Sequence, residues 1–440
     1  MAVRVDSLRS GATLYRRNSD KLVVPASNMK LFTLAVAAER LGWDYRFETR
    51  LEAAGAVAGG TLTGDLIVLG GGDPSIVSPD LGHPQLFLEW AGALRDAGIR
   101  RVDGRIIGDD TAFDSEGLGA GWAWDYLTDA YAAPSGALSY HDNVVELRIT
   151  PGRVEGDLVT IDLAPPGSQF LVENNARTGP AGSAATIAVG RLPGNARLRV
   201  TGRVPASGTP MARVTTIDNP TRFFVEALRL ALASRGITVT DGAWDQDDLS
   251  RPPNGAPRRL IARRESAPLS SIGAQMLKVS QNFYAEMLLK AIGRTPVRAG
   301  SAAAGRQAVR STLAGWGIAN DAIVMNDGSG LSRYDYVTAD AVVALLSRMW
   351  QDERMRGPFT AALPVGAHDG TLANRMKDPA LDRRVQAKTG TIANMRALSG
   401  FLETNSGERL AFAIIANHVT ATNAEVDAVA EKVLLRLVTR

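Results

Sequence analysis

The chain of 440 residues contains no cysteine, which excludes disulfide bonds, thiol nucleophiles and cysteine-ligated zinc. Histidine is also scarce. The four histidines, His83, His141, His368 and His418, are scattered, and no two of them have the spacing of a metal-binding motif. These absences disfavour a metal-dependent hydrolase and a Ser-His-Asp triad.

Long apolar runs are missing too. The longest, around residues 31–38, is far shorter than the roughly 20 residues that a bilayer-spanning helix needs. Residues 1–9 alternate like a strand and lack the apolar core of a signal peptide, so we expect the chain to start inside a longer precursor or to stay in the cytoplasm. A net charge of +3, with no basic block interleaved with aromatics, predicts no nucleic-acid partner.

What is present is the composition of a soluble globular protein, with 45% hydrophobic and 22% charged residues and length for two or three domains. Periodicity predicts a β-hairpin over 2–16, strands over 45–54, 65–69, 102–109, 384–390, 397–403 and 409–417, and helices over 84–97, 220–235, 268–292, 301–316, 338–350 and 423–438. Turn-rich residues 146–214 predict a small all-β unit, and residues 251–259 a Pro/Arg-rich connector.

The first chemical signal is at Ser27. A proline and small residues precede it, Lys30 follows three positions later, and apolar residues continue at helical spacing. We therefore predict that Ser27 stands at a helix N-terminus with the Lys30 amine within hydrogen-bonding reach. A lysine whose pKa is lowered by burial can activate a serine, and the N-terminal amides favour an oxyanion. A serine N-cap followed by a surface lysine would show the same pattern.

A second motif, Ser-Gln-Asn, covers residues 280–282 in a segment predicted to be helical. Ser280 could relay a proton between the Ser27–Lys30 pair and a leaving amine. Asn282 could hold a substrate amide, because its side chain both donates and accepts hydrogen bonds. A polar edge of an amphipathic helix is the alternative interpretation of this motif.

A third motif, Lys-Thr-Gly-Thr, covers residues 388–391 at the end of a strand-like run. The ammonium of Lys388 and the hydroxyl of Thr389 suit a substrate carboxylate. The glycine allows close approach of a substrate backbone, and the N–H of Thr391 could form an oxyanion hole with that of Ser27. Seen alone, the motif also fits an exposed strand end.

In this order, Ser-x-x-Lys, Ser-x-Asn and Lys-Thr-Gly resemble the active-site set of penicillin-binding proteins and serine β-lactamases. The first two motifs are 280 − 27 = 253 residues apart, far more than in the compact β-lactamases. The chain is similar to the D-alanyl-D-alanine carboxypeptidase/endopeptidase family, the low-molecular-mass penicillin-binding proteins of class C. The resemblance rests on this long insertion and on the segments 71–75, 121–124, 327–332 and 370–372. The resemblance covers essentially the whole chain.

The resemblance implies an α/β (α+β) fold. Its penicilloyl-serine transferase core would hold an antiparallel five-stranded sheet flanked by helices, with two mostly β domains inserted. The core would comprise residues 1–55 and 262–440, the inserted domain II residues 56–145 and 215–261, and the small β domain III residues 146–214.

The resemblance also assigns roles. Ser27 would be the acylated nucleophile, Lys30 its base, and Ser280 part of the proton relay. The residues expected to bind substrate are Asn282, Lys388, Thr389, Thr391 and Arg333. In some members the residue at Arg333 helps to form a pocket for the stem-peptide side chain, and an acidic residue follows the Trp-[Asp/Asn] pair. Here Tyr126 follows Asp125, a departure that bears on recognition of a free amino group.

The implied activity is that of a serine D-Ala-D-Ala carboxypeptidase/endopeptidase, which acts on peptidoglycan stem peptides through an acyl-Ser27 intermediate. β-Lactams would be covalent inhibitors, no metal or cofactor would be needed, and the location would be periplasmic or otherwise extracytoplasmic. Three alternatives are a β-lactamase, a catalytically silent relative that binds peptidoglycan or a protein, and an esterase or aminopeptidase. The long insertion argues against the first, the intact trio against the second, and the Lys388–Thr389 pair against the third.

Overall fold

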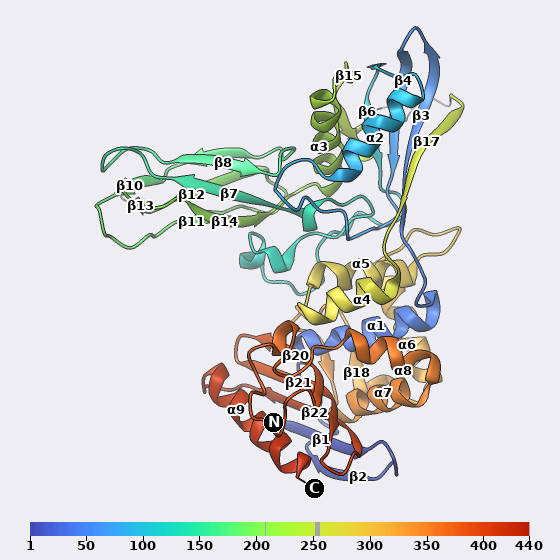
Figure 1. The fold of residues 1–440 in the computed structure, drawn as a ribbon, viewed down its shortest axis with the longest axis vertical. Helices are drawn as coiled ribbons and strands as arrows, with labels where there is room; N and C mark the ends of the chain where they lie inside the picture. The colour runs from blue at the N-terminus through green and yellow to red at the C-terminus, as the bar shows by residue number, and fades with distance from the viewer. Residues whose placement is uncertain (207, 251–255, 440) are drawn as a thin grey trace. The chain divides into compact units, whose positions relative to one another are not determined.

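The computed structural model describes residues 1–206, 208–250 and 256–439 (Figure 1), so residues 251–255 of the expected connector lie outside the described part. The chain forms two compact units. The first comprises Met1–Arg46, Gly119–Trp122 and Ala267–Arg440, and the second Phe47–Leu118 and Ala123–Ser266. The division into a core and domains II and III stays a prediction. In the described ranges, no helix has the length and apolar character needed to cross a membrane.

The first unit is built on a five-stranded antiparallel sheet in the order β2-β1-β22-β21-β20. Its strands are β1 (Ala2–Ser7), β2 (Thr13–Arg17), β20 (Val385–Ile392), β21 (Met395–Glu403) and β22 (Arg409–Asn417). The start and the end of the chain meet in this sheet, where Ala2 pairs with Ile415. The prediction of an antiparallel five-stranded sheet is confirmed.

Helices cover both faces of this sheet, because its strands β21 and β22 are apolar on both sides. Successive strand residues point to opposite faces. On one face, Leu398 shares a buried cluster with Leu434 of α9 (Asn423–Val438). On the other face, Phe401 contacts Trp350 of α7 (Ala339–Gln351), with ring centroids 5.4 Å apart. The predicted helices at 338–350 and 423–438 are thereby confirmed.

The other elements of this unit are α1 (Met29–Leu41), α4 (Leu269–Lys278), α5 (Asn282–Gly293), α6 (Ala302–Gly315), α8 (Glu353–Ala362), β18 (Ile323–Val324) and β19 (Tyr336–Val337). The central helix is α1, which contacts α4, α5, α6, α7 and α8. Its residues 29–38 are all buried, as expected of a helix that is apolar on every side. Lys30 is the charged member of this buried stretch.

The single helix predicted over 268–292 is wrong. The structure breaks it into α4 and α5, and Ser280 lies between them with a φ of 62°, a left-handed conformation that ends a helix. The side chain of Gln281 then caps α5 by accepting a bond from the N–H of Phe283. The motif residue Ser280 therefore stands on a connection rather than on a helix face.

The second unit contains a seven-stranded sheet with the path β15-β5-β4-β3-β17, to which β6 and β16 are added through β4. These strands are β3 (Glu48–Ala58), β4 (Thr61–Leu69), β5 (Arg101–Asp103), β6 (Ile106–Asp109), β15 (Thr238–Val239), β16 (Ala243–Asp245) and β17 (Arg258–Glu265). Helices α2 (Gln85–Asp96) and α3 (Pro220–Ser234) contact each other, and Phe87 and Phe224 meet edge to face between them. The strand predicted over 102–109 is interrupted at residues 104–105, between β5 and β6.

Short strands fill the turn-rich region of the second unit. They are β7 (Val144–Thr150), β8 (Thr160–Ala164), β9 (Leu171–Asn174), β10 (Arg177–Gly179), β11 (Ala188–Gly190), β12 (Arg197–Thr201), β13 (Arg203–Pro205) and β14 (Met211–Thr216). They form two three-stranded sheets and a two-stranded one. A buried cluster that includes Leu147, Val159 and Val200 lies among them, which agrees with the β structure predicted for residues 146–214.

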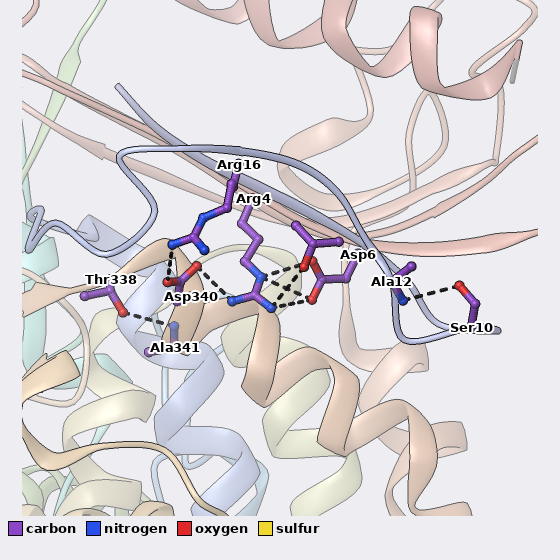
Figure 2. A network of polar contacts seen from close by, with 9 residues as sticks. Arg4, Asp6, Ser10, Ala12, Arg16, Thr338, Asp340 and Ala341 are labelled. Atoms are coloured by element: carbon purple, nitrogen blue, oxygen red, sulfur yellow. Dashed lines mark hydrogen bonds and ion pairs between the residues drawn. The ribbon is translucent and has the colours of Figure 1, made fainter.

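A polar network joins the first strand of the chain to α7 (Figure 2). The guanidinium of Arg4 donates from Nη2 to Asp6 Oδ2 at 2.8 Å and from Nη1 to Asp340 Oδ1 at 2.9 Å. Arg16 reaches the other oxygen of Asp340 at 3.8 Å, and Thr338 caps the helix by accepting from the N–H of Ala341. The network fixes the start of α7 against β1 and β2.

Candidate active site

Ser27 lies in the 3-10 turn Ala26–Asn28, which leads directly into α1. The sequence predicts that Ser27 stands at the N-terminus of a helix with Lys30 close by. In the structure it stands just before the helix, in the short turn that precedes α1, and Lys30 lies in the first turn of α1. This turn lies close to β20, because a Cβ on Gly390 would be 2.8 Å from the carbonyl oxygen of Pro25 and 2.9 Å from Asn28 Nδ2. Only glycine permits this approach without a shift of one element.

The ammonium of Lys30 has three hydrogen-bond partners. Its Nζ lies 2.9 Å from Ser27 Oγ, 2.6 Å from Asn282 Oδ1 and 2.8 Å from the carbonyl oxygen of Ser329. These three acceptors use all three donors of a protonated lysine. The structure therefore brings together the predicted nucleophile, its base and the asparagine of the second motif.

Burial gives Lys30 the property that a base needs. The side chain is fully buried, and removal of its charge from water lowers the pKa of Lys30 from 10.5 to about 7. The negative charges of Asp327, Glu286 and Asp335 oppose this effect. A neutral Lys30 can accept the proton of Ser27 at neutral pH.

A second pair stands beside the first. Lys388 Nζ donates to Ser280 Oγ at 2.9 Å and to the carbonyl oxygen of Thr389 at 2.8 Å. Lys388 is also fully buried, and burial together with the charge of Lys30 lowers its pKa well below the usual value. Ser280 is therefore hydrogen-bonded to Lys388. Within the described part of the chain it has no hydrogen bond to Lys30, which a direct proton relay between the two residues would use.

The remaining predicted residues differ in their surroundings. Thr389 is buried and donates to the hydroxyl of Thr371 at 2.8 Å. Thr391 follows on the exposed side of β20, where its hydroxyl accepts from Arg396. Arg333 is exposed, in the turn after residue 332. The structure therefore gathers Ser27, Lys30 and Asn282 in one group and Ser280, Lys388 and Thr389 in the other.

Several residues at the site have no role in the sequence prediction. Glu286 is buried and accepts hydrogen bonds from the N–H groups of Gly328 and Ser329, and Asp327 is buried in the adjoining loop. Neither polar atom of the fully buried Asn28 has a partner within the described part of the chain. The family resemblance points to part of this group, because it includes the segments 121–124, 327–332 and 370–372. No sequence feature points to Glu286.

A possible metal site is confined to the second unit. The carboxylates of Asp110, Asp245 and Asp247 have oxygen atoms within 4.8 Å of one another, the one such group in the described ranges. Asp245 is buried and Asp110 is half-buried, and burial raises the pKa of Asp110 to about 6. Acidic side chains often gather without an ion, and around Ser27 the described residues include no such group.

The chain resembles known proteins over most of its length. Residues 1–436 match the family described as D-Ala-D-Ala carboxypeptidase 3 (S13). A D-alanyl-D-alanine carboxypeptidase of Actinomadura sp. strain R39 is 37% identical over 423 residues, which cover 93% of this chain and 76% of that protein.

Solved structures agree as well. The crystal structure of penicillin-binding protein 4 (DacB) from Haemophilus influenzae superposes with a TM-score of 0.87 at 25% identity, covering 100% of this chain and 96% of the other. The same protein in complex with a β-lactam, at 24% identity and a TM-score of 0.80, covers 98% and 93% and shows the same fold. The chain therefore belongs to the D-Ala-D-Ala carboxypeptidase 3 (S13) family and is a serine-type D-Ala-D-Ala carboxypeptidase.

Proposed function

We propose that Ser27 is the nucleophile with which this enzyme cleaves D-Ala-D-Ala termini of peptidoglycan stem peptides, and that it does so outside the cytoplasm. The observation that carries the proposal is the 2.9 Å contact between Ser27 Oγ and the fully buried Nζ of Lys30. Burial keeps about half of the Lys30 amines neutral at pH 7, since its pKa is about 7. A neutral amine at this distance is a general base for the serine.

The acylation step forms a bond between Ser27 Oγ and the carbonyl carbon of the penultimate D-Ala. The hydroxyl proton passes to Lys30 Nζ, and the N–H groups of Ser27 and Thr391 stabilise the oxyanion. The C–N bond to the terminal D-Ala then breaks, and the leaving amine receives the proton from Lys30 through the hydroxyl of Ser280. Water next attacks the ester carbonyl carbon and gives a proton to Lys30 Nζ. The bond between the acyl carbon and Ser27 Oγ then breaks, and Lys30 returns this proton to Ser27 Oγ.

Lys388 and Thr389 bind the terminal carboxylate of the substrate, while Asn282 holds the peptide amide and Arg333 contacts the stem-peptide side chain. A carboxylate beside Lys388 raises the pKa of that amine again, because an opposite charge favours the ammonium form. It also competes with Ser280 for Lys388 Nζ, which at present donates to Ser280 Oγ at 2.9 Å. Substrate binding thereby frees the Ser280 hydroxyl for proton transfer to the leaving amine.

β-Lactams acylate the same serine. Support comes from the H. influenzae relative, which has been crystallised with a β-lactam. We expect slow release of the acyl-enzyme rather than the fast hydrolysis that a β-lactamase performs.

The test is labelling with a fluorescent penicillin, followed by mass spectrometry of the modified peptide. Wild-type protein and Ser271→Ala, a control at an exposed serine of α4, should carry a persistent adduct on Ser27, whereas Ser27→Ala should carry none. Rapid loss of the adduct would favour a β-lactamase. Absence of an adduct on folded wild-type protein would favour a silent binding protein.

A peptide ending in D-Ala-D-Ala, compared with its C-terminal amide, tests the substrate class. Preference for the free carboxylate is the expected result, because Lys388 is placed to bind it. Equal cleavage of the two peptides would instead support an esterase or aminopeptidase specificity.

A further inference from the structure

The loop that contains Ser329, whose carbonyl oxygen is the third partner of Lys30, packs between the turn that carries Ser27 and α5. Thr33 of α1 donates to the carbonyl oxygen of Gly328 at 2.7 Å. A Cβ on Gly328 would lie 2.6 Å from the carbonyl oxygen of Ala285, and one on Gly330 would overlap the carbonyl oxygen of Ala26. Gly330 also has a φ of 81°. These two glycines let residues 327–332, hereafter the aspartate loop, pack directly against the turn that carries Ser27 and against α5.

The carboxylate of Asp327 fixes the aspartate loop from within. Its Oδ1 accepts from the N–H of Gly330 at 2.6 Å, and its Oδ2 accepts from the N–H of Ser332 at 2.6 Å. Asp327 is fully buried. Ser329 lies inside the turn that these bonds close, and its carbonyl oxygen accepts from Lys30 Nζ at 2.8 Å. The direction of that carbonyl therefore depends on the conformation that Asp327 imposes.

An indole from a distant part of the sequence completes the arrangement. Trp122 donates from Nε1 to Asp327 Oδ2 at 2.8 Å. It comes from Gly119–Trp122, a four-residue segment that belongs to the first unit although residues of the second unit flank it on both sides. A Cβ on Gly121 would lie 2.5 Å from the ring of Tyr334 and 2.8 Å from Ser332 Oγ, so this segment lies against the aspartate loop.

We propose that Asp327, held by Trp122, is a positioning residue for acylation: it sets the aspartate loop so that the Ser329 carbonyl directs Lys30 Nζ toward Ser27 Oγ. The proposal rests on the proposed function, because it assumes that Ser27 is acylated with Lys30 as its base. It also gives Trp122 a role: its indole holds the Asp327 carboxylate, and Asp327 in turn positions the loop that contacts Lys30.

Electrostatics distinguishes a positioning role from a merely structural one. The charged groups that face Lys30 are Asp327 and Asp335 around the aspartate loop, Glu286 from α5 and Lys388 from β20. The negative charge of Asp327 raises the pKa of Lys30 against the effect of burial. Loss of the Asp327 charge also lowers the pKa of Glu286, whose ionisation then raises the pKa of Lys30 in part. Because Asp327 has the larger effect on Lys30, the pKa of Lys30 still falls, whereas opening of the site to water raises it toward 10.5.

The test uses the full chain in four variants. Asp327→Asn removes the negative charge. Its NH2 group then faces a hydrogen-bond donor, either the N–H of Gly330 or the N–H groups of Ser332 and Trp122 that now bond to Oδ2. Trp122→Phe removes the indole donor and keeps the charge of Asp327. The matched controls are Asp65→Asn, a buried aspartate bonded to Arg105, and Trp244→Phe, an indole that donates to the carbonyl oxygen of Asp241.

The measurement is the acylation rate constant at saturating fluorescent penicillin, with its apparent binding constant, from pH 5.5 to 9. For Asp327→Asn we expect the high-pH plateau to fall by about tenfold to a hundredfold, as for a misplaced catalytic group, and the midpoint to move to lower pH. For Trp122→Phe we expect a fall of about threefold, less than for loss of the charge itself, and an unmoved midpoint. The binding constant and both controls should match wild type.

A wild-type plateau for Asp327→Asn, or a midpoint displaced to higher pH, would overturn the proposal. If Asp327→Asn does not fold, Trp122→Phe decides, and a plateau equal to that of Trp244→Phe would count against the role. Failure of the wild-type protein to label on Ser27 would be a different result, since it refutes the proposed function rather than the role of Asp327.

Discussion

Raising the pH from 6 to 8 should accelerate acylation of Ser27 about tenfold. Lys30 must be neutral to accept the serine proton, and its pKa is lowered to about 7 by burial. The neutral fraction then rises from about 0.1 at pH 6 to about 0.9 at pH 8. At its ordinary pKa of 10.5, a lysine would be neutral in only about one molecule in 3,000 at pH 7.

The buried acids broaden this transition. Burial and the charge of Asp327 raise the pKa of Glu286 to about 7, so Glu286 and Lys30 titrate over the same range. As Glu286 ionises with rising pH, its new negative charge favours the ammonium form of Lys30. The midpoint therefore belongs to the coupled pair. We expect the rise to extend beyond the roughly two pH units that a single group needs, so about tenfold is the upper value for the acceleration between pH 6 and 8.

The assay is the rate of fluorescent-penicillin labelling at saturation, measured on wild type, Lys30→Arg and Lys432→Arg. Arginine keeps the charge but cannot deprotonate, so Lys30→Arg should lose roughly 10²- to 10⁴-fold in rate and show no rise with pH. Lys432 is exposed on α9, and its arginine variant should follow wild type. A flat or falling wild-type profile between pH 6 and 8 would refute the assignment of Lys30 as the base.

Two further substitutions test packing around the site and the fold that supports it. Gly390→Ala places a Cβ 2.8 Å from the Pro25 carbonyl oxygen, so labelling of Ser27 should slow by about tenfold through displacement of β20, whereas Gly315→Ala, in open space on α6, should label like wild type. Arg4→Ala should lower the free energy of unfolding in urea by about 1 to 3 kcal/mol through loss of its charge-assisted bonds, with labelling unchanged. The control is Arg9→Ala, at an exposed arginine. If Arg4→Ala lowers the free energy of unfolding no more than Arg9→Ala does, the expected value is wrong.

Prediction from the sequence succeeds where the signal is local or ordered along the chain. The strands of the five-stranded sheet alternate or are apolar on both faces, and the three motifs occur in family order. It failed at Ser280, because apolar positions such as Met276 and Phe283 continue the helical period across the break. The left-handed φ of Ser280 accompanies a bond from Lys388, which is 108 positions away. A contact at that separation leaves no trace in local periodicity.

The buried acids were beyond the reach of sequence reasoning for a related reason. Glu286 lies on α5 four residues after Asn282, where a carboxylate looks like part of a solvated helix face. Its burial follows from the packing of α5 against α1 and α6 and from the aspartate loop, whose N–H groups it accepts. Motif similarity singled out Asp327 and Trp122, but the bond between them depends on a chain path of 205 residues.

Burial and negative charge act on the pKa of Lys30 in opposite directions, and the proposed acyl transfer needs both. Burial alone would leave a neutral amine whose pKa lies too low to hold the proton that the leaving group must later receive. The acids alone, in contact with water, would leave a permanent ammonium that cannot accept the serine proton. Their balance brings the pKa of Lys30 to about 7. The same carboxylates hold the aspartate loop through backbone N–H groups, so base strength and base position are set by one group of side chains and cannot be adjusted separately.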